Sequence, residues 1–143
     1  MKWYLNSLRK WRSFSGRACR KEFWMFWLFQ FIFALVFSFT SNIIFRSNIL
    51  YSVFLIITFF PALTVTVRRL HDVGKSGIWA YVPFSIMLPQ ILINEYIYDL
   101  SRWAGGFGAI LFGFGIVLII FSAKEGKRGE NKWGQNPLER HHE

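Results

Sequence analysis

The sequence predicts an all-α membrane protein with four transmembrane helices, because most of the chain consists of long apolar runs. Of its 143 residues, 53% are hydrophobic, 20% are aromatic and only 17% are charged, which is unusual for a soluble domain. Each run approaches or reaches the roughly 20 helical residues that cross the hydrocarbon core of a bilayer. Too little polar sequence remains to cover a soluble core, so membrane spans are favoured over buried core helices.

The whole chain, residues 1–143, is predicted to form a single integral membrane domain. The predicted spans cover residues 23–45, 49–67, 78–94 and 103–122. Pro61 is a position where the second span can kink. The third span is the weakest prediction, because it has seventeen residues, two prolines and Asn94 at its end. A kinked, tilted or re-entrant path is therefore open for it.

The placement of basic residues predicts that both termini are cytoplasmic. All but two of the 17 Lys and Arg residues lie before the first span, between the second and third, or in the tail, residues 123–143. The exceptions are Arg46 and Arg102. Basic residues near span ends favour the cytoplasmic side, and four spans put these three segments together there. This placement accounts for the net charge of +9 without a nucleic-acid partner.

No cleaved signal peptide is expected, because residues 1–22 form a long basic segment and no Ala-x-Ala-like cleavage pattern follows. Cys19 is the only cysteine, so no internal disulfide can form. The first fourteen residues predict an amphipathic helix in the membrane interface. Its apolar side groups Trp3, Tyr4, Leu8, Trp11 and Phe14. The alternative is a solvated helix that packs on the protein's own loops.

Polar and small residues within the spans predict contacts between helices. Gln30 and Asn42 are expected to form interhelical hydrogen bonds. Gly105, Ala109 and Gly113 recur every fourth residue, and this small-residue face packs either inside the monomer or against a second copy in a homo-oligomer. The predicted spans contain no Asp, Glu, Lys, Arg or His. A conventional ion-coupled transporter is therefore disfavoured, since such proteins keep ionisable groups at membrane depth.

The predicted cytoplasmic face holds a candidate site for an anionic headgroup or a partner, centred on the central loop VRRLHDVGKSG. The candidate residues are Arg17, Arg68, Arg69, His71, Asp72 and Lys75. Arginine binds phosphate through two parallel hydrogen bonds, which makes anionic phospholipids the expected ligands. In the structural alternative, the arginines anchor the second span at the interface, and Asp72 caps the next turn or pairs with Arg17.

No catalytic, cofactor or metal site is predicted, so an enzyme is not expected. The central loop lacks the Gly-x4-Gly-Lys-Ser/Thr spacing of a P-loop. His71 lies next to Asp72, but adjacent residues seldom orient each other for catalysis, and no nucleophile is marked out beside them. The other histidines, His141 and His142, do not make a paired metal motif.

Three stretches, in order, resemble the motifs of the DUF805 family of small bacterial inner-membrane proteins. They are FSGRACRKEFW (14–24), VRRLHDVGKSG (67–77) and KEGKRGENKWGQNP (124–137). The family pattern reads FSGRxxRxEFW, RRLHDxGxSGWW and GxxGxNxYGxNP. Ile78 and Trp133 depart from it, standing where an aromatic residue and a tyrosine are usual. The resemblance implies a four-helix, multi-pass protein of the bacterial inner (plasma) membrane without an established biochemical role.

Two functional classes follow from the sequence. The favoured one is a membrane scaffold or interaction protein whose basic cytoplasmic face contacts anionic lipid headgroups, its own copies or a partner. The alternative is a transport accessory or an oligomeric permeation unit, since four spans would have to assemble with further copies to enclose a path.

Overall fold

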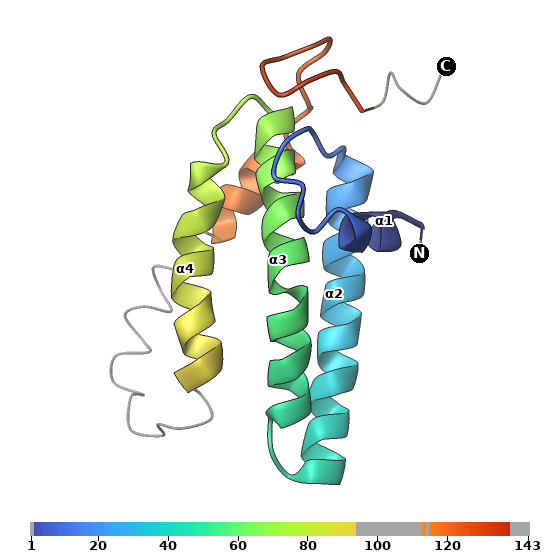
Figure 1. The fold of residues 1–143 in the computed structure, drawn as a ribbon, viewed down its shortest axis with the longest axis vertical. Coiled ribbons are helices and arrows are strands. Elements are labelled where there is room, and N and C mark those ends of the chain that lie inside the picture. Colours follow the sequence, from blue (N-terminus) through green and yellow to red (C-terminus); the bar gives the residue numbers. More distant parts are fainter. Residues whose placement is uncertain (1, 94–112, 114, 138–143) are drawn as a thin grey trace.

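The fold is a set of long helices crossed at one side by a short N-terminal helix (Figure 1). The computed structural model describes residues 2–93, 113 and 115–137. Its named helices are α1 (Lys2–Arg9), α2 (Arg20–Thr40), the π-helix η1 (Ser41–Phe45), α3 (Ile49–Asp72) and α4 (Ile78–Ile93). Residues 115–123 are helical as well, and a bend follows them at Lys124. The described residues contain helices and no strand, as the sequence predicts.

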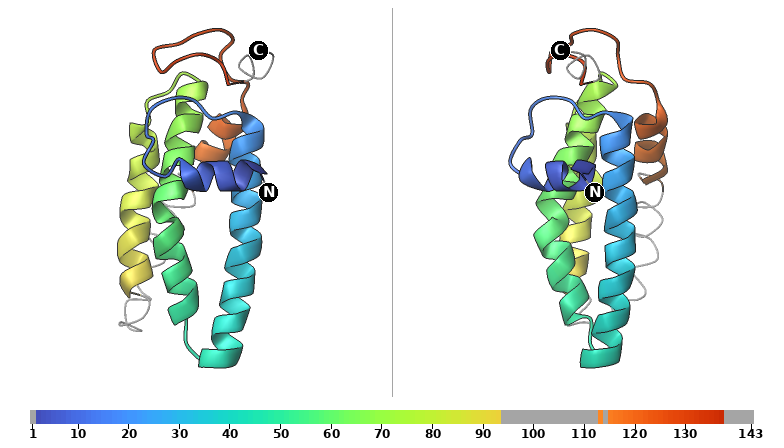
Figure 2. Two further views of the ribbon diagram at one scale, coloured as in Figure 1. Left: turned by 45° about the vertical axis from the view of Figure 1, so that its right-hand side comes forward. Right: turned by 90° about the vertical axis from the view of Figure 1, so that its right-hand side faces the viewer.

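Two of the described helical segments are long and apolar enough to cross a membrane. The first, Arg20–Phe45, joins α2 and η1 and has 26 residues; the second, Ile49–Asp72, is α3 and has 24. They run side by side in opposite directions (Figures 1 and 2). At 1.5 Å per residue they measure about 39 and 36 Å, which exceeds a hydrocarbon core of about 30 Å. One end of each helix is therefore expected at headgroup level.

Both spans differ from their predicted bounds at the ends that carry charge. The first helix begins at Arg20 instead of Phe23, and α3 continues to Asp72 instead of ending at Val67. The prediction that residues 67–77 form a loop is wrong for most of that stretch, and only residues 73–77 connect α3 to α4. Hydropathy marks where a helix faces lipid, whereas helical hydrogen bonds continue as long as the polar side chains find partners.

The remaining predicted spans are described only in part. The third corresponds to α4, whose 16 residues measure about 24 Å. Of the fourth, residues 103–112 and 114 lie outside the described residues, while residues 115–123 are helical up to the bend. Gly105 and Ala109 also lie outside the described residues. Four spans, and an oligomer formed through that face, therefore stay predictions.

The N-terminal helix α1 packs across α2 and α3 (Figure 2). Tyr4 is buried, and its ring centroid lies 5.3 Å from that of Phe26 and 5.5 Å from that of Phe33. Burial also raises the pKa of the Tyr4 hydroxyl. The predicted helix covered the first fourteen residues, but α1 ends five residues earlier, at Arg9, and the chain then forms a turn. This contact agrees with packing on the protein itself, and a position in the membrane interface stays a prediction.

Away from the helix ends that carry charge, few polar side chains connect α2 to α3. Gln30 on α2 donates to the Thr58 hydroxyl on α3 at 2.7 Å, which confirms the predicted interhelical hydrogen bond. For Asn42 the prediction is not confirmed: among the described residues its side chain donates to the Ser38 carbonyl one turn earlier in the same helical segment, at 2.9 Å. In the bundle the contact is otherwise apolar, as in the stack of Phe37 on Phe54.

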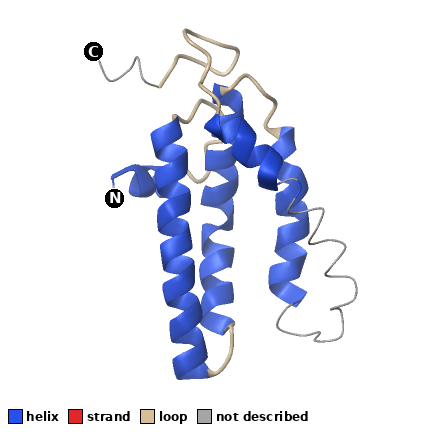
Figure 3. Ribbon diagram, turned by 180° about the vertical axis from the view of Figure 1, so that it is seen from behind, coloured by secondary structure: helices blue, strands red, loops and turns tan. Residues whose placement is uncertain are grey.

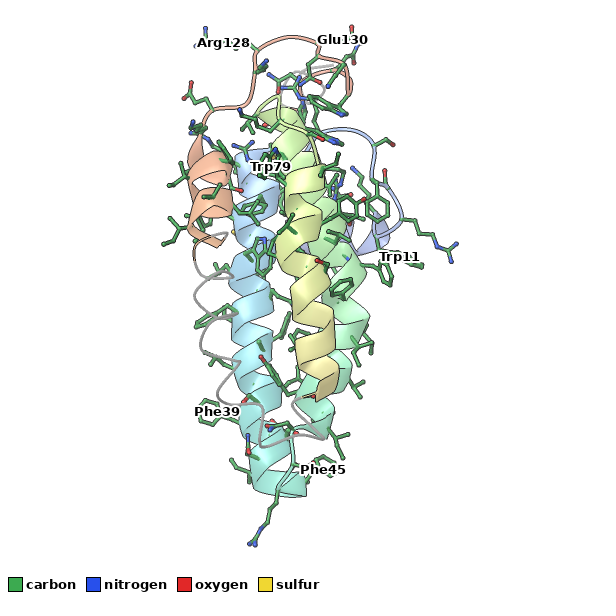
Figure 4. All side chains as sticks on the ribbon, turned by 90° about the vertical axis from the view of Figure 1, so that its left-hand side faces the viewer. Trp11, Phe39, Phe45, Trp79, Arg128 and Glu130 are labelled. Atoms are coloured by element: carbon green, nitrogen blue, oxygen red, sulfur yellow. The ribbon has the colours of Figure 1, made fainter. Side chains whose placement is uncertain are left out.

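The outer surface of the long helices is apolar. Phe39 is 66% exposed and Phe45 59%, and both lie towards the end opposite to Arg128 and Glu130 (Figure 4). Large exposed apolar surfaces are rare on soluble monomers and are expected where lipid covers the protein. Most of the described loops gather at the other end of the long helices (Figure 3).

Candidate functional site

The three polar motifs meet at one end of the helices (Figures 1 and 3). We call residues 14–24, 67–77 and 124–137 together the charged end. Backbone hydrogen bonds connect its three parts: the Ala18 amide donates to the Arg68 carbonyl at 3.1 Å, and the Lys127 amide donates to the Asp72 carbonyl at 2.9 Å. The last turn of α3 is therefore held between the N-terminal connection and the tail.

The carboxylate of Asp72 lies between two arginines at the centre of the charged end. Arg17 Nε donates to Oδ1 at 2.9 Å, and Arg69 Nη1 donates to Oδ2. All three side chains are buried, and Arg69 has no exposed surface. The predicted pairing of Asp72 with Arg17 is confirmed. Buried charges are stable only when they are paired and fully hydrogen-bonded, so the remaining donors also need acceptors.

Those acceptors are backbone carbonyls, of the tail and of the helical residue Ser122 just before it. Arg69 donates to the Ser122 carbonyl from Nε at 3.1 Å and from Nη2 at 3.0 Å, and Nη2 also contacts the Lys124 carbonyl. Arg17 Nη1 donates to the Gly129 carbonyl at 2.6 Å. Lysine offers no planar fork of five donors, so arginine is the residue suited to hold several carbonyls at once. The two guanidinium groups thus fix the tail to α3.

A second ion pair joins α2 to α3 and to α1. Arg68 Nη1 donates to Glu22 Oε1 at 2.9 Å, and the Ser7 hydroxyl donates to the same oxygen at 3.1 Å. Glu22 is 3% exposed and Arg68 2%. Among the described residues, Nε and Nη2 of Arg68 have no hydrogen-bond partner. This guanidinium is therefore only partly satisfied, unlike those of Arg17 and Arg69.

His71 and Lys75 occupy different positions from those arginines. The His71 ring stacks on Trp133 of the tail with centroids 4.5 Å apart, and its Nδ1 lies 3.3 Å from the Gly16 carbonyl. Lys75 is exposed in the connection to α4, and its ammonium group lies 5.4 Å from the Phe121 ring centroid. His71 thus belongs to the contact with the tail, and Lys75 lies at the surface.

Gly126 explains part of the tail motif. A Cβ atom at this position would overlap the Asp72 carboxylate, so only glycine lets the tail backbone approach it this closely. Gly77 has a similar role beside α3, because a Cβ there would lie 2.6 Å from Val67 Cγ1.

An open cavity of about 730 Å³ lies beside α1 at the charged end. Its charged lining is four basic side chains and one acidic side chain, namely Lys2, Lys10, Arg17, Arg68 and Glu22. Of the six residues predicted to bind an anion, Arg17 and Arg68 line this cavity. Within the described part of the chain, no group of three or more His, Cys, Asp or Glu residues could hold a metal ion.

Sequence reasoning missed Glu22, which is the partner of Arg68. A signal was present, because Glu22 and Asp72 are the only acidic residues among the first 94. Two carboxylates among so many basic groups are natural candidates for buried ion pairs. The carbonyl acceptors of Arg17 and Arg69 left no such signal, since any residue can supply a carbonyl.

Long helices with an apolar exterior and a charged cap define a helical membrane protein. The chain belongs to the DUF805 family, whose model, described as "Protein of unknown function", matches residues 11–135. It is 33% identical over 141 residues to the inner membrane protein YhaI of Escherichia coli K12, covering 96% of each chain. It is 31% identical over 142 residues to the inner membrane protein YhaH of that strain, covering 96% of this chain and 97% of the relative.

A further relative, the uncharacterized protein YiiR of the same strain, is 32% identical over 129 residues, covering 87% of this chain and 85% of the relative. No solved structure matches. The names of YhaI and YhaH support an inner-membrane location for this chain. Neither the family description nor these names indicate an enzymatic activity.

Proposed function

We propose that this protein is a membrane scaffold or interaction protein whose basic face binds anionic phospholipid headgroups. One observation carries the proposal: the exposed charge of the described residues is almost entirely basic on the charged end and on the adjoining residues 2–12. Eleven basic side chains are exposed there, against two acidic ones, Glu125 and Glu130. The basic ones are Lys2, Arg9, Lys10, Arg12, Arg20, Lys21, Lys75, Lys124, Lys127, Arg128 and Lys132.

Such a face is attracted to a membrane surface that contains anionic lipid. Each basic residue close to that surface contributes about 1 kcal/mol, and the attraction falls off within a Debye length of roughly 8 Å at physiological salt. If the charged end faces the cytoplasm, as predicted, it lies at the cytoplasmic leaflet, where basic segments bind anionic lipids. The buried arginines Arg17 and Arg69 contribute little to this attraction, because their donors are engaged inside the protein.

The test is lipid retention by the purified full chain, measured by native mass spectrometry from bilayers with equal amounts of phosphatidylglycerol and phosphatidylcholine. We expect preferential retention of phosphatidylglycerol that weakens with added salt. The triple variant Lys127→Gln, Arg128→Gln, Lys132→Gln should lower this preference, while Arg46→Gln, at the opposite end, should leave it unchanged. Equal retention of the two lipids by the unmodified protein would rule out the proposed function.

A further inference from the structure

We propose that the cavity beside α1 is a binding site for one phosphate group, held in place by Arg68. The proposal rests on the proposed function, since it names the place where an anionic ligand binds. It concerns a specific site, whereas the basic face as a whole attracts anionic surfaces through many exposed charges. The two can be tested separately.

The state of Arg68 is the first observation that points to a ligand. Its side chain is 2% exposed and lines the cavity, yet Nε and Nη2 have no hydrogen-bond partner among the described residues. Buried polar groups are nearly always paired, and an unpaired buried donor on a charged group is costly. Such a donor pair is explained by a bound anion or by ordered water in the cavity.

The two unpaired nitrogens lie on one edge of the guanidinium. Glu22 takes only Nη1, at 2.9 Å, so the edge formed by Nε and Nη2 keeps two unpaired donors. Both nitrogens are buried, so a ligand reaches them only when the surrounding lining of the cavity moves. Two parallel N–H donors in a plane match two oxygens of a phosphate group and bind them bidentately. In the described residues, no hydrogen bond joins this edge to Glu22, whose contacts with Ser7 and with Nη1 of Arg68 are both made through Oε1.

The rest of the cavity also suits an anion. Lys2 and Lys10 line it from α1 and the turn after it, and both are exposed, so they can move towards a ligand. With Arg17 and Arg68 they outnumber the single acidic side chain of the lining, Glu22. A volume of about 730 Å³ exceeds the needs of a free phosphate ion and leaves room for a larger headgroup. The ligand class is therefore a phosphate ester, either a lipid headgroup or a soluble phosphate compound.

The decisive variants change the rim of the cavity without touching a buried pair. Lys2→Gln with Lys10→Gln removes two charges from the lining. Arg9→Gln with Arg12→Gln removes two exposed charges from the same segment, outside the lining. General attraction to a charged surface predicts the same loss for both, whereas a specific site predicts about a tenfold loss of affinity for the lysine pair and less than about twofold for the arginine pair.

Arg68→Lys tests the fork itself. It keeps a positive charge beside Glu22 and removes the Nε and Nη2 edge, and we expect about a tenfold weaker affinity. Because this residue is buried, Glu22→Gln with Arg68→Met serves as a second variant that removes both members of the ion pair together. It avoids a lone buried charge, and we expect it to lose the ligand while the thermal unfolding transition stays cooperative.

The probes are phosphatidylglycerol in mixed micelles, followed by native mass spectrometry, and inorganic phosphate against chloride, followed by titration calorimetry. Retention of phosphatidylglycerol alone identifies a lipid headgroup, and binding of inorganic phosphate identifies soluble phosphate chemistry; either supports the site if the lysine pair and Arg68→Lys weaken it. Equal binding by all variants overturns the site but leaves the proposed function standing, because general attraction then explains retention. Absence of both ligands from the unmodified protein overturns both.

Discussion

A single carboxylate organises the charged end at the scale of residues. Asp72 receives one guanidinium from the N-terminal connection and another from its own helix, and those two arginines hold the tail through its carbonyls. Buried ion pairs add little net stability compared with apolar packing, but the loss of one partner leaves an uncompensated charge. The network therefore acts mainly by fixing how the three motifs fit together.

Replacement of Asp72 by asparagine should destabilise the protein by about 3–5 kcal/mol, because Arg17 and Arg69 would then lack their carboxylate. The measurement is the free energy of unfolding in detergent. Glu125→Gln is the matched control: its side chain is 81% exposed and lies 3.9 Å from Arg20, so the change should stay within about 0.5 kcal/mol. Similar effects of the two substitutions would contradict a buried network at Asp72.

Gly126→Ala should destabilise the tail contact by about 1–3 kcal/mol, because its methyl group would displace the Asp72 carboxylate. Gly115→Ala is the control, since a Cβ at that helical position meets nothing within 4 Å, and the change should be neutral or stabilise the helix by up to about 1 kcal/mol. Thermal unfolding of both variants distinguishes them. A harmless Gly126→Ala would show that the tail does not approach Asp72 closely.

Residue patterns predicted part of this site. The pairing of Arg17 with Asp72 could be anticipated, because oppositely charged residues in neighbouring polar segments favour contact. The full occupation of Arg69 could not, because its acceptors are main-chain carbonyls whose positions depend on the folded path of the tail. The half-satisfied state of Arg68 is likewise a property of geometry alone.

The main lesson at the scale of elements concerns helix ends. The long apolar runs predicted α2 and α3 because twenty consecutive apolar residues favour a span. The prediction ended α3 too early, since Arg68–Asp72 read as a polar loop. Their side chains are buried among partners from the other motifs, and this burial lets the helix continue. Arg68 and Arg69, which were predicted to lie in a loop, therefore lie near the C-terminal end of α3.

Tyr4→Ala should release α1 from the long helices, because Tyr4 provides the buried aromatic contact with Phe26 and Phe33. We expect a loss of about 3 kcal/mol in the local opening free energy of residues 2–9, measured by hydrogen–deuterium exchange in detergent. Leu5→Ala, on the exposed side of the same helix, should change this exchange little. Unchanged protection in Tyr4→Ala would show that other contacts hold α1.

The whole molecule is strongly polarised. In the described residues, Arg46 is the one exposed basic side chain at the end opposite to the charged end, since it directly follows Phe45, which lies there (Figure 4). The remaining exposed basic residues lie on the charged end or on residues 2–12. Such segregation, read together with the basic residues near span ends, predicts that the charged end faces the cytoplasm. It also accounts for the net charge without a further partner.

Cysteine labelling in cells tests this orientation. In a Cys19→Ala background, Arg46→Cys should react with a membrane-impermeant thiol reagent in spheroplasts, whereas Arg128→Cys and Lys75→Cys should react only after the membrane is permeabilised. The reason is that Arg46 directly follows Phe45, which lies at the opposite end from Arg128 (Figure 4), while Lys75 follows the charged end of α3. Labelling of Arg46→Cys and Arg128→Cys from the same side would refute the orientation.

The central claim is that the three motifs close around Asp72 and leave the Nε and Nη2 edge of Arg68 unpaired beside a cavity that binds a phosphate group. The most direct measurement is an experimental structure of the full chain in a bilayer containing phosphatidylglycerol. We predict Arg17 and Arg69 on opposite oxygens of Asp72, the tail carbonyls on both guanidinium groups, and phosphate density at the unpaired edge of Arg68. A tail detached from α3, with Asp72 open to water, would contradict the account.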